Sequence, residues 1–145
     1  MGYSKKELIT MLVVAERKNP TRTVTMPSDV VPILVRYATR KQEHFVAITL
    51  TSAHNVIRVH VVTIGILNLT IVHPREVFAH AIRDRADAII IAHNHPSGAL
   101  FPSTDDHGVT TRMIQAGTLL GISVLDHVII SKNGYYSFRE NGNIG

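Results

Sequence analysis

The chain has 145 residues, of which 45% are hydrophobic and 18% are charged, and it contains no cysteine. These values fit one globular domain and exclude a disordered chain, a disulfide scaffold and a thiolate metal site, so a metal would have to bind to histidine or carboxylate side chains. The formal net charge is +4, and residues 1–41 carry eight of the 15 basic residues but only three of the 11 acidic ones.

The first predicted element is an amphipathic helix over residues 4–18, with Leu8, Leu12 and Ala15 on one face and Pro20 beyond its end. Acidic residues flank its apolar stretch, which argues against a signal peptide. No apolar run reaches the roughly 18 residues that a membrane span needs. We therefore expect a cytoplasmic protein with no membrane segment.

Ser28 is predicted to cap a helix over residues 29–41, with Pro32 in its first turn. Two runs rich in β-branched residues follow at 44–51 and 56–65 and predict a pair of strands. We divide the chain into an N-terminal helix and connector, residues 1–27, and a domain, residues 28–145.

Further along, Pro74 and Glu76 predict the start of a helix. The sequence "DAIII" at 87–91 predicts a strand buried on both faces. A second helix is expected to end at Gly121, with its buried stripe at Val109, Met113, Ala116 and Leu120. The segments 122–131 and 135–138 complete the strands. This order predicts an α/β (α+β) fold in which a mixed sheet is sandwiched by helices.

The stretch "HNHPSGALFPSTDD", residues 93–106, follows the buried strand directly. Alternate residues of an extended chain project to the same side, so His93 and His95 can point at one metal ion. If a helix begins at Ser103, Asp106 lies in its first turn and faces back toward the loop. Two imidazoles and one carboxylate leave a tetrahedral Zn²⁺ with one open position, as in catalytic zinc sites.

Other interpretations of the same residues remain open. Ser103 and Asp106 also have the spacing of a helix capping box, which needs no metal but is compatible with one. Asp105 is a competing carboxylate ligand. Two histidines separated by one residue are a weak signal in a chain with nine histidines.

The order of these residues resembles the H-x-H-x7-S-x2-D signature of the JAMM metalloproteases, or MPN domain. Within that superfamily "HNHPSG", "LDHVIIS" and "YYSFRENG" are similar to the RadC branch. The segments "TIGILN", "VHPREVFAHAI" and "GTLLGISVLDH" extend the resemblance over about residues 28–142. The resemblance implies a JAMM/MPN-like, cytidine-deaminase-like fold.

The resemblance also implies roles for individual residues. His93, His95 and Asp106 correspond to the zinc ligands, and Ser103 to a serine that supports the water or the developing oxyanion. Glu43 in "KQEHFV" corresponds to the general base. These roles imply a zinc metallopeptidase or isopeptidase that acts on a peptide or protein substrate.

An alternative function is that of a nucleic-acid-binding protein that uses its basic N-terminal segment and retains the JAMM fold without peptidase activity; its association with DNA repair is implied only by the resemblance to RadC. That partner is weakly supported, because such charge is most often a solvated helix face. A zinc deaminase is excluded because its cysteine ligands are missing. Asp126 and His127 are expected either to orient the site or to pack within a strand, and Asn94 to hydrogen-bond locally.

Overall fold

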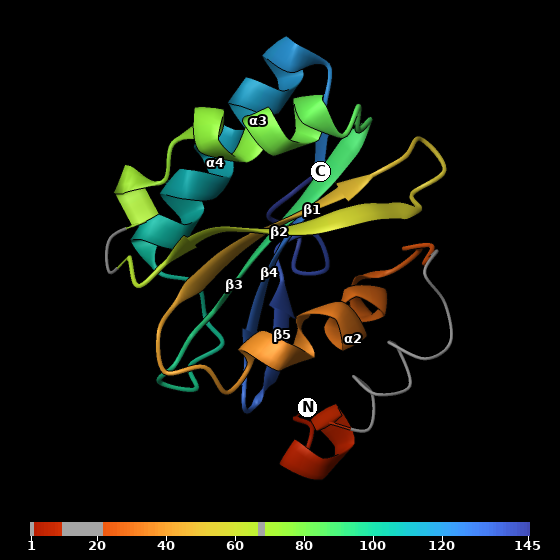
Figure 1. Cartoon of the computed structure of the whole chain (residues 1–145). Helices are drawn as coiled ribbons and strands as arrows, with labels where there is room; N and C mark the ends of the chain where they lie inside the picture. Colours follow the sequence, from red (N-terminus) through yellow and green to blue (C-terminus); the bar gives the residue numbers. More distant parts are fainter. Residues whose placement is uncertain (1, 10–21, 67–68) are drawn as a thin grey trace.

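A five-stranded mixed sheet forms the centre of the fold, in the strand order β2-β1-β3-β4-β5 (Figure 1). The computed structural model describes residues 2–9, 22–66 and 69–145. The strands β3 and β4 are parallel, and the other neighbouring pairs are antiparallel. The strands are β1 (His44–Leu50), β2 (Val56–Ile64), β3 (Ala88–Asn94), β4 (Ser123–Ser131) and β5 (Gly134–Ser137).

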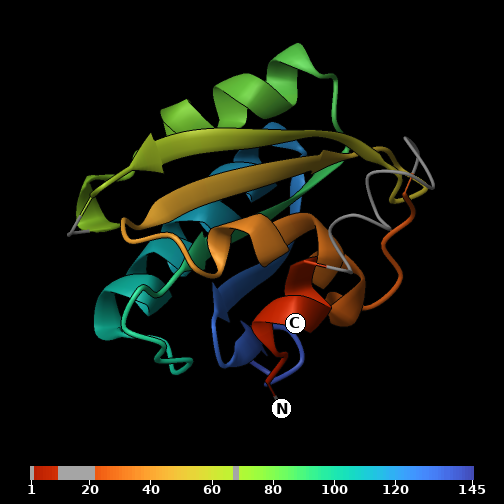
Figure 2. The same cartoon turned by 60° about the horizontal axis from the view of Figure 1, so that its bottom comes forward.

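Helical segments cover both faces of the sheet, as Figures 1 and 2 show. They are η1 (Pro27–Val30), α2 (Val31–Leu34), η2 (Val35–Tyr37), η3 (Leu69–Ile71), α3 (Pro74–Arg83) and α4 (Thr104–Leu120), and residues 5–9 are also helical. The segment η1–α2–η2 packs on one face, together with Leu8. Helices α3 and α4 pack on the other, where Phe78 and Met113 are buried. The predicted α/β sandwich is confirmed.

The central strand β3 is buried along its whole length, as the uninterrupted apolar run predicted. Ile89 and Ile91 belong to the core under α3 and α4, while Ile90 and Ala92 belong to the core under α2. Successive side chains of β3 therefore point to opposite faces of the sheet. This alternation continues to the end of the strand at Asn94 and decides where the polar residues there point.

The prediction of one continuous helix over residues 29–41 is wrong. The helical segment begins at Pro27, ends at Tyr37 and changes between 3₁₀ and α geometry. Pro32 has no N–H to donate to the carbonyl of Ser28, which instead accepts the N–H of Val31 in a 3₁₀ turn. Ser28 is not the cap, because Met26 occupies the N-cap position and the carboxylate of Asp29 accepts the backbone N–H groups of Thr25 and Met26 just before the segment.

The predicted start of α3 and both ends of α4 are confirmed. Proline occupies the first turn of α3, and Gly121 ends α4 in the left-handed conformation with φ 71°. The predicted burial of Leu120 is wrong, because this side chain is 49% exposed beside α3 and Gly117 faces the core instead. Of the helix expected over residues 4–18, residues 10–18 lie outside the described part of the chain.

Candidate metal centre

The end of β3 brings two imidazoles together. His93 lies within the strand and is buried, and its Nε2 is 3.0 Å from Nε2 of His95. The backbone N–H of His95 donates to the carbonyl of Ile130 at 3.0 Å, which keeps the chain beside β4 beyond the end of the strand. The Nδ1 atom of His95 is 3.0 Å from the carbonyl oxygen of Ala99, so the following loop fixes the orientation of this ring.

The first turn of α4 directs a carboxylate at both histidines. Asp106 Oδ1 is 3.2 Å from His93 Nε2, and Asp106 Oδ2 is 3.3 Å from His95 Nε2. The capping box is also present, since Ser103 N–H donates to Asp106 Oδ2 at 2.8 Å and Ser103 Oγ accepts Asp106 N–H at 3.1 Å. Capping therefore aims the carboxylate at the imidazoles. Asp105, the competing candidate, is exposed, whereas Asp106 is buried.

Glu43 approaches the same point from the residue before β1. Its Oε1 is 3.7 Å from His93 Nε2, and its side chain is 19% exposed. One potential ligand atom from each of Glu43, His93 and His95 lies within 4.8 Å of the other two. The structure thus brings together four of the five residues singled out in the sequence, with Ser103 as the helix cap beside them.

A chain of hydrogen bonds supports His93 from behind. His93 Nδ1 is 2.8 Å from Nε2 of His127 on β4, and His127 Nδ1 is 2.5 Å from Oγ1 of Thr110 on α4. Thr110 Oγ1 in turn donates to the backbone carbonyl of Asp106 at 2.7 Å. Sequence reasoning found His127 but missed Thr110. The only feature of the sequence that could have indicated Thr110 is its position four residues after Asp106, which places both residues on one face of α4.

Asp126 does not take part in this chain, although it adjoins His127 in the sequence. A bulge in β4 opposite Ile89 and Ile90 directs Asp126 to the other face of the sheet. There its carboxylate accepts the Ser137 hydroxyl and the backbone N–H of Arg139. The expectation that Asp126 orients the site is wrong, and its carboxylate instead anchors the chain that follows β5.

The charges of the cluster are coupled. Burial alone would raise the pKa of Asp106, but hydrogen bonds from His93 and His95 hold it well below its usual range. Burial lowers the pKa of His95, yet the hydrogen bond and the charge of Asp106 outweigh that effect and raise it. Burial raises the pKa of Glu43 and lowers the pKa of His127 well below its ordinary value. His127 is therefore a neutral imidazole near pH 7.

The spacing of the donor atoms fits a metal ion. Zinc bonds of about 2.0–2.1 Å at tetrahedral angles separate neighbouring ligand atoms by about 3.3 Å. The contacts among His93, His95 and Asp106, at 3.0, 3.2 and 3.3 Å, match that separation. Glu43 is farther from His93, at 3.7 Å, which suits a group beside the ion rather than a fourth ligand. Two nitrogens and one carboxylate are also the donor set of catalytic zinc sites.

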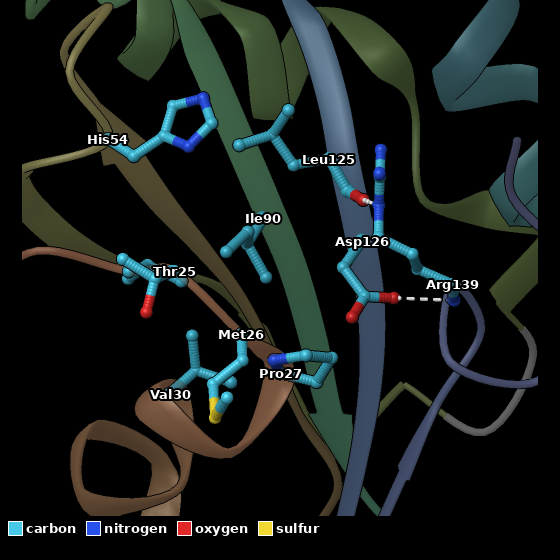
Figure 3. A pocket seen from close by; sticks show the side chains of 10 residues that line it. Thr25, Met26, Pro27, Val30, His54, Ile90, Leu125, Asp126 and Arg139 are labelled. Atoms are coloured by element: carbon cyan, nitrogen blue, oxygen red, sulfur yellow. Dashed lines mark hydrogen bonds between the residues drawn. The ribbon is translucent and has the colours of Figure 1, made fainter.

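A separate cavity of about 100 Å³ lies on the opposite face of the sheet (Figure 3). It is lined mainly by apolar side chains, including Met26, Val30 and Leu125, with Asp126 and Arg139 at one side. The hydrogen bonds drawn there join Arg139 to Asp126 and to the carbonyl of Leu125. The sheet separates this cavity from His93 and His95, so it is not part of the metal centre.

Comparisons with known proteins identify the family of the chain. The RadC-like JAB domain family matches residues 24–143. The chain belongs to this family. Similar proteins include a "UPF0758 protein" of Methanococcoides burtonii, 41% identical over 99% of this chain and 66% of the relative. A protein of the same name from Rubrobacter xylanophilus is 46% identical over 94% of this chain and 60% of the relative. Another, from Methanospirillum hungatei, is 52% identical over 71% of this chain and 46% of the relative.

The JAB domain described here spans about half to two thirds of the length of these relatives, between 46% and 66%. The predicted division into residues 1–27 and 28–145 stays a prediction, although Leu8 and Val24 both pack into the core of the domain. Within the described ranges, the JAB domain has no helix with the length and hydropathy that crossing a membrane requires.

Proposed function

We propose that this RadC-like JAB domain is a zinc-dependent hydrolase of peptide or isopeptide bonds. The observation that carries the proposal is the convergence of Glu43 and Asp106 on the two imidazoles at the end of β3. A cluster of this kind has the ligands for an ion and a spare carboxylate that can move a proton. Metal-assisted hydrolysis of an amide uses both.

His93, His95 and Asp106 would hold the zinc ion. When bound, zinc supplies the Lewis acidity that makes hydroxide available near neutral pH and polarises a carbonyl. The capping hydrogen bonds from Ser103 keep the Asp106 carboxylate directed at the imidazoles without help from the ion. The protein therefore presents its ligands in a nearly fixed arrangement, which reduces the reorganisation needed for binding.

Glu43 is the general base. It takes one proton from the attacking water as the new carbon–oxygen bond forms, and it gives that proton to the leaving nitrogen as the carbon–nitrogen bond breaks. The products are a carboxylic acid and an amine. The Ser103 hydroxyl accepts a hydrogen bond from Asp106 N–H and is exposed, so its own proton is available to the negative charge that develops on the carbonyl oxygen.

His127 and Thr110 fix the tautomer of His93. If Nε2 of His93 binds the ion through its lone pair, Nδ1 carries the proton and donates to His127 Nε2. Neutral His127 then donates from its Nδ1 to Thr110 Oγ1, and the Thr110 hydroxyl donates to the Asp106 carbonyl. Each donor in this chain has one acceptor. The buried hydrogen bonds behind His93 are all satisfied with the proton on Nδ1, and a neutral His93 then has the lone pair of Nε2 available to bind a metal.

Metal analysis and a peptide-library assay test the proposal. The purified protein should contain one zinc ion, and a His93→Ala/His95→Ala variant should lose it. Glu43→Gln should retain zinc and lose hydrolysis by at least 10²-fold, the lower range for general base catalysis. Glu76→Gln is the matched control, because Glu76 is exposed at the start of α3. Stoichiometric zinc in the double alanine variant, or hydrolysis that survives Glu43→Gln, would contradict the assignment.

The association with nucleic acid is a separate candidate that rests on the basic N-terminal segment. Part of that segment, including Arg17 and Lys18, lies outside the described residues. If the wild-type protein binds zinc but hydrolyses no peptide, that result would argue against the peptidase function. A salt-dependent DNA titration would then be the next measurement.

A further inference from the structure

Asn94 separates the two histidines in the sequence and lies on the opposite side of the strand end. Its side chain is fully buried, and its amide makes three hydrogen bonds. Oδ1 accepts the backbone N–H of His44 at 2.6 Å, and Nδ2 donates to the carbonyls of Gln42 at 3.0 Å and Arg40 at 3.4 Å. The expectation of a local hydrogen bond is wrong, because every partner lies at least 50 residues earlier in the chain.

Two of these partners, the Gln42 carbonyl and the His44 N–H, belong to the two peptide groups that flank the α-carbon of Glu43. The Gln42 carbonyl belongs to the peptide group before it, and the His44 N–H belongs to the peptide group after it. Two peptide planes joined at one α-carbon define its φ and ψ angles. A single amide that binds both planes therefore restricts the backbone of Glu43, and with it the direction in which the side chain leaves the chain.

The neighbouring strands show why a side chain is needed here. The regular pairing of β1 with β3 ends at Phe45 and His93. His44 lies one residue beyond this pair, so its backbone N–H has no partner in the ladder between β1 and β3. On the other side, the Glu43 carbonyl accepts the N–H of Gly65 at 2.8 Å, after β2. Asn94 extends the ladder beyond its last backbone pair. The peptide group between Glu43 and His44 is thus held from both sides.

We propose that Asn94 is a positioning residue that fixes the backbone of Glu43 and thereby aims its carboxylate at His93. The inference rests on the proposed role of Glu43 as the general base. The site needs an acceptor for one N–H and a donor for two carbonyls on one short, rigid side chain. Aspartate provides only the acceptor when ionised, and serine cannot reach both peptide groups. Because side chains alternate along β3, the two histidines point into the metal site, and the asparagine between them binds the backbone of the proposed base, Glu43.

The test is a double-mutant cycle between Asn94→Ala and Glu43→Gln in the zinc-loaded protein. In the wild-type background Asn94→Ala should lower kcat by about 10- to 100-fold with little change in KM, as expected for a misplaced catalytic group. In the Glu43→Gln background it should change kcat by less than about threefold, since Asn94 acts through Glu43. Asn141→Ala, which removes a side-chain amide that donates to the Ser137 carbonyl at the end of β5, is the matched control.

Hydrogen exchange measured by NMR gives a reading that does not depend on activity. Asn94→Ala should speed the exchange of the His44 amide at least about tenfold and leave the Phe138 amide, bonded to the His127 carbonyl, unchanged. If Asn94→Ala does not fold, Asn94→Asp is the alternative variant. It keeps the acceptor for the His44 N–H and loses the donor to the Gln42 carbonyl, so kcat should still fall.

The outcomes separate the two proposals. Losses of kcat that multiply in the double variant, or an unchanged exchange rate at His44, would overturn the positioning role. Faster exchange at His44 in a protein whose wild type hydrolyses no peptide would support the conformational restraint while refuting the proposed function.

Discussion

Replacing Thr110 with valine removes one hydroxyl from behind the metal centre and almost nothing else. Thr110 is 3% exposed and is hydrogen-bonded both to His127 and to the Asp106 carbonyl. Valine has nearly the same shape, so the core should not collapse or expand. The buried His127 Nδ1–H loses its acceptor, and an unsatisfied buried donor costs about 1–3 kcal/mol. The free energy of unfolding should fall by that amount.

The same change should weaken metal binding. Without Thr110, neutral His127 can place its proton on Nε2, and it then no longer accepts a hydrogen bond from Nδ1–H of His93. Loss of such an outer partner typically lowers metal affinity about 10- to 100-fold. Competition with a chromophoric chelator measures the zinc affinity, and urea unfolding in a chelator measures the stability of the metal-free protein.

Thr110→Ser is the matched control, because it keeps the hydroxyl and removes only a methyl group. It should retain zinc affinity within about threefold of wild type while losing some stability. If Thr110→Val binds zinc as tightly as wild type and remains folded, the tautomer of His93 does not depend on this hydrogen-bonded chain. Equal losses in the valine and serine variants would also refute the reasoning, because packing would then explain both.

Two predictions concern the fold. Burial alone would raise the pKa of Asp84, but hydrogen bonds from His60 at 2.6 Å and Thr49 at 2.7 Å lower it below its ordinary value. Its stabilising effect is therefore complete above the unfolded pKa of about 3.9 and is lost as the pH falls through the folded pKa. Asp84→Asn should lose about 1.5–3 kcal/mol at pH 7 and converge with wild type at acid pH. Urea unfolding from pH 7 down to about pH 2, below the unfolded pKa of about 3.9, checks this, and a gap that stays constant over the whole range would contradict it. Gly117→Ala would place a β-carbon 2.3 Å from a backbone carbonyl, whereas Gly108→Ala meets nothing within 4 Å on the same helix. The first should lose about 1–3 kcal/mol by overpacking and the second gain about 0.5–1 kcal/mol of helix propensity, so thermal shifts of the same sign would argue against the assigned packing.

Local patterns predicted the elements that carry the proposed metal ligands. The apolar run before His93 predicted the buried strand β3, and Ser103 and Gly121 predicted the two ends of α4. Both signals are short-range, because a cap or a two-residue alternation acts within one turn or one strand. The approach of Asp106 to the histidines could therefore be inferred once the start of α4 was known.

Other features depend on contacts that no local pattern contains. The helix predicted over residues 29–41 is broken because the loss of one donor at Pro32 outweighed the apolar pattern around it. Asp126 faces away from the site because a bulge in β4 reverses the expected alternation. The Glu43 position came from family resemblance alone, since nothing near it in the sequence marks it as a base.

The H-x-H pattern has a consequence that two separate histidines would not have. At the end of β3, His93 points toward α4, and Asn94 points toward the segment that carries Glu43. A shift of this strand end would move the metal ligand and the restraint on the base together. The distance of 3.7 Å between Glu43 and His93 is therefore set by one rigid element rather than by two loops. The proposed catalysis depends on that distance, because a proton transfer requires the base within reach of the water. Substitutions that loosen the end of β3 should therefore impair metal binding and base catalysis together, whereas substitutions at Ser103 should act through the Asp106 carboxylate and the developing oxyanion and leave the position of Glu43 unchanged.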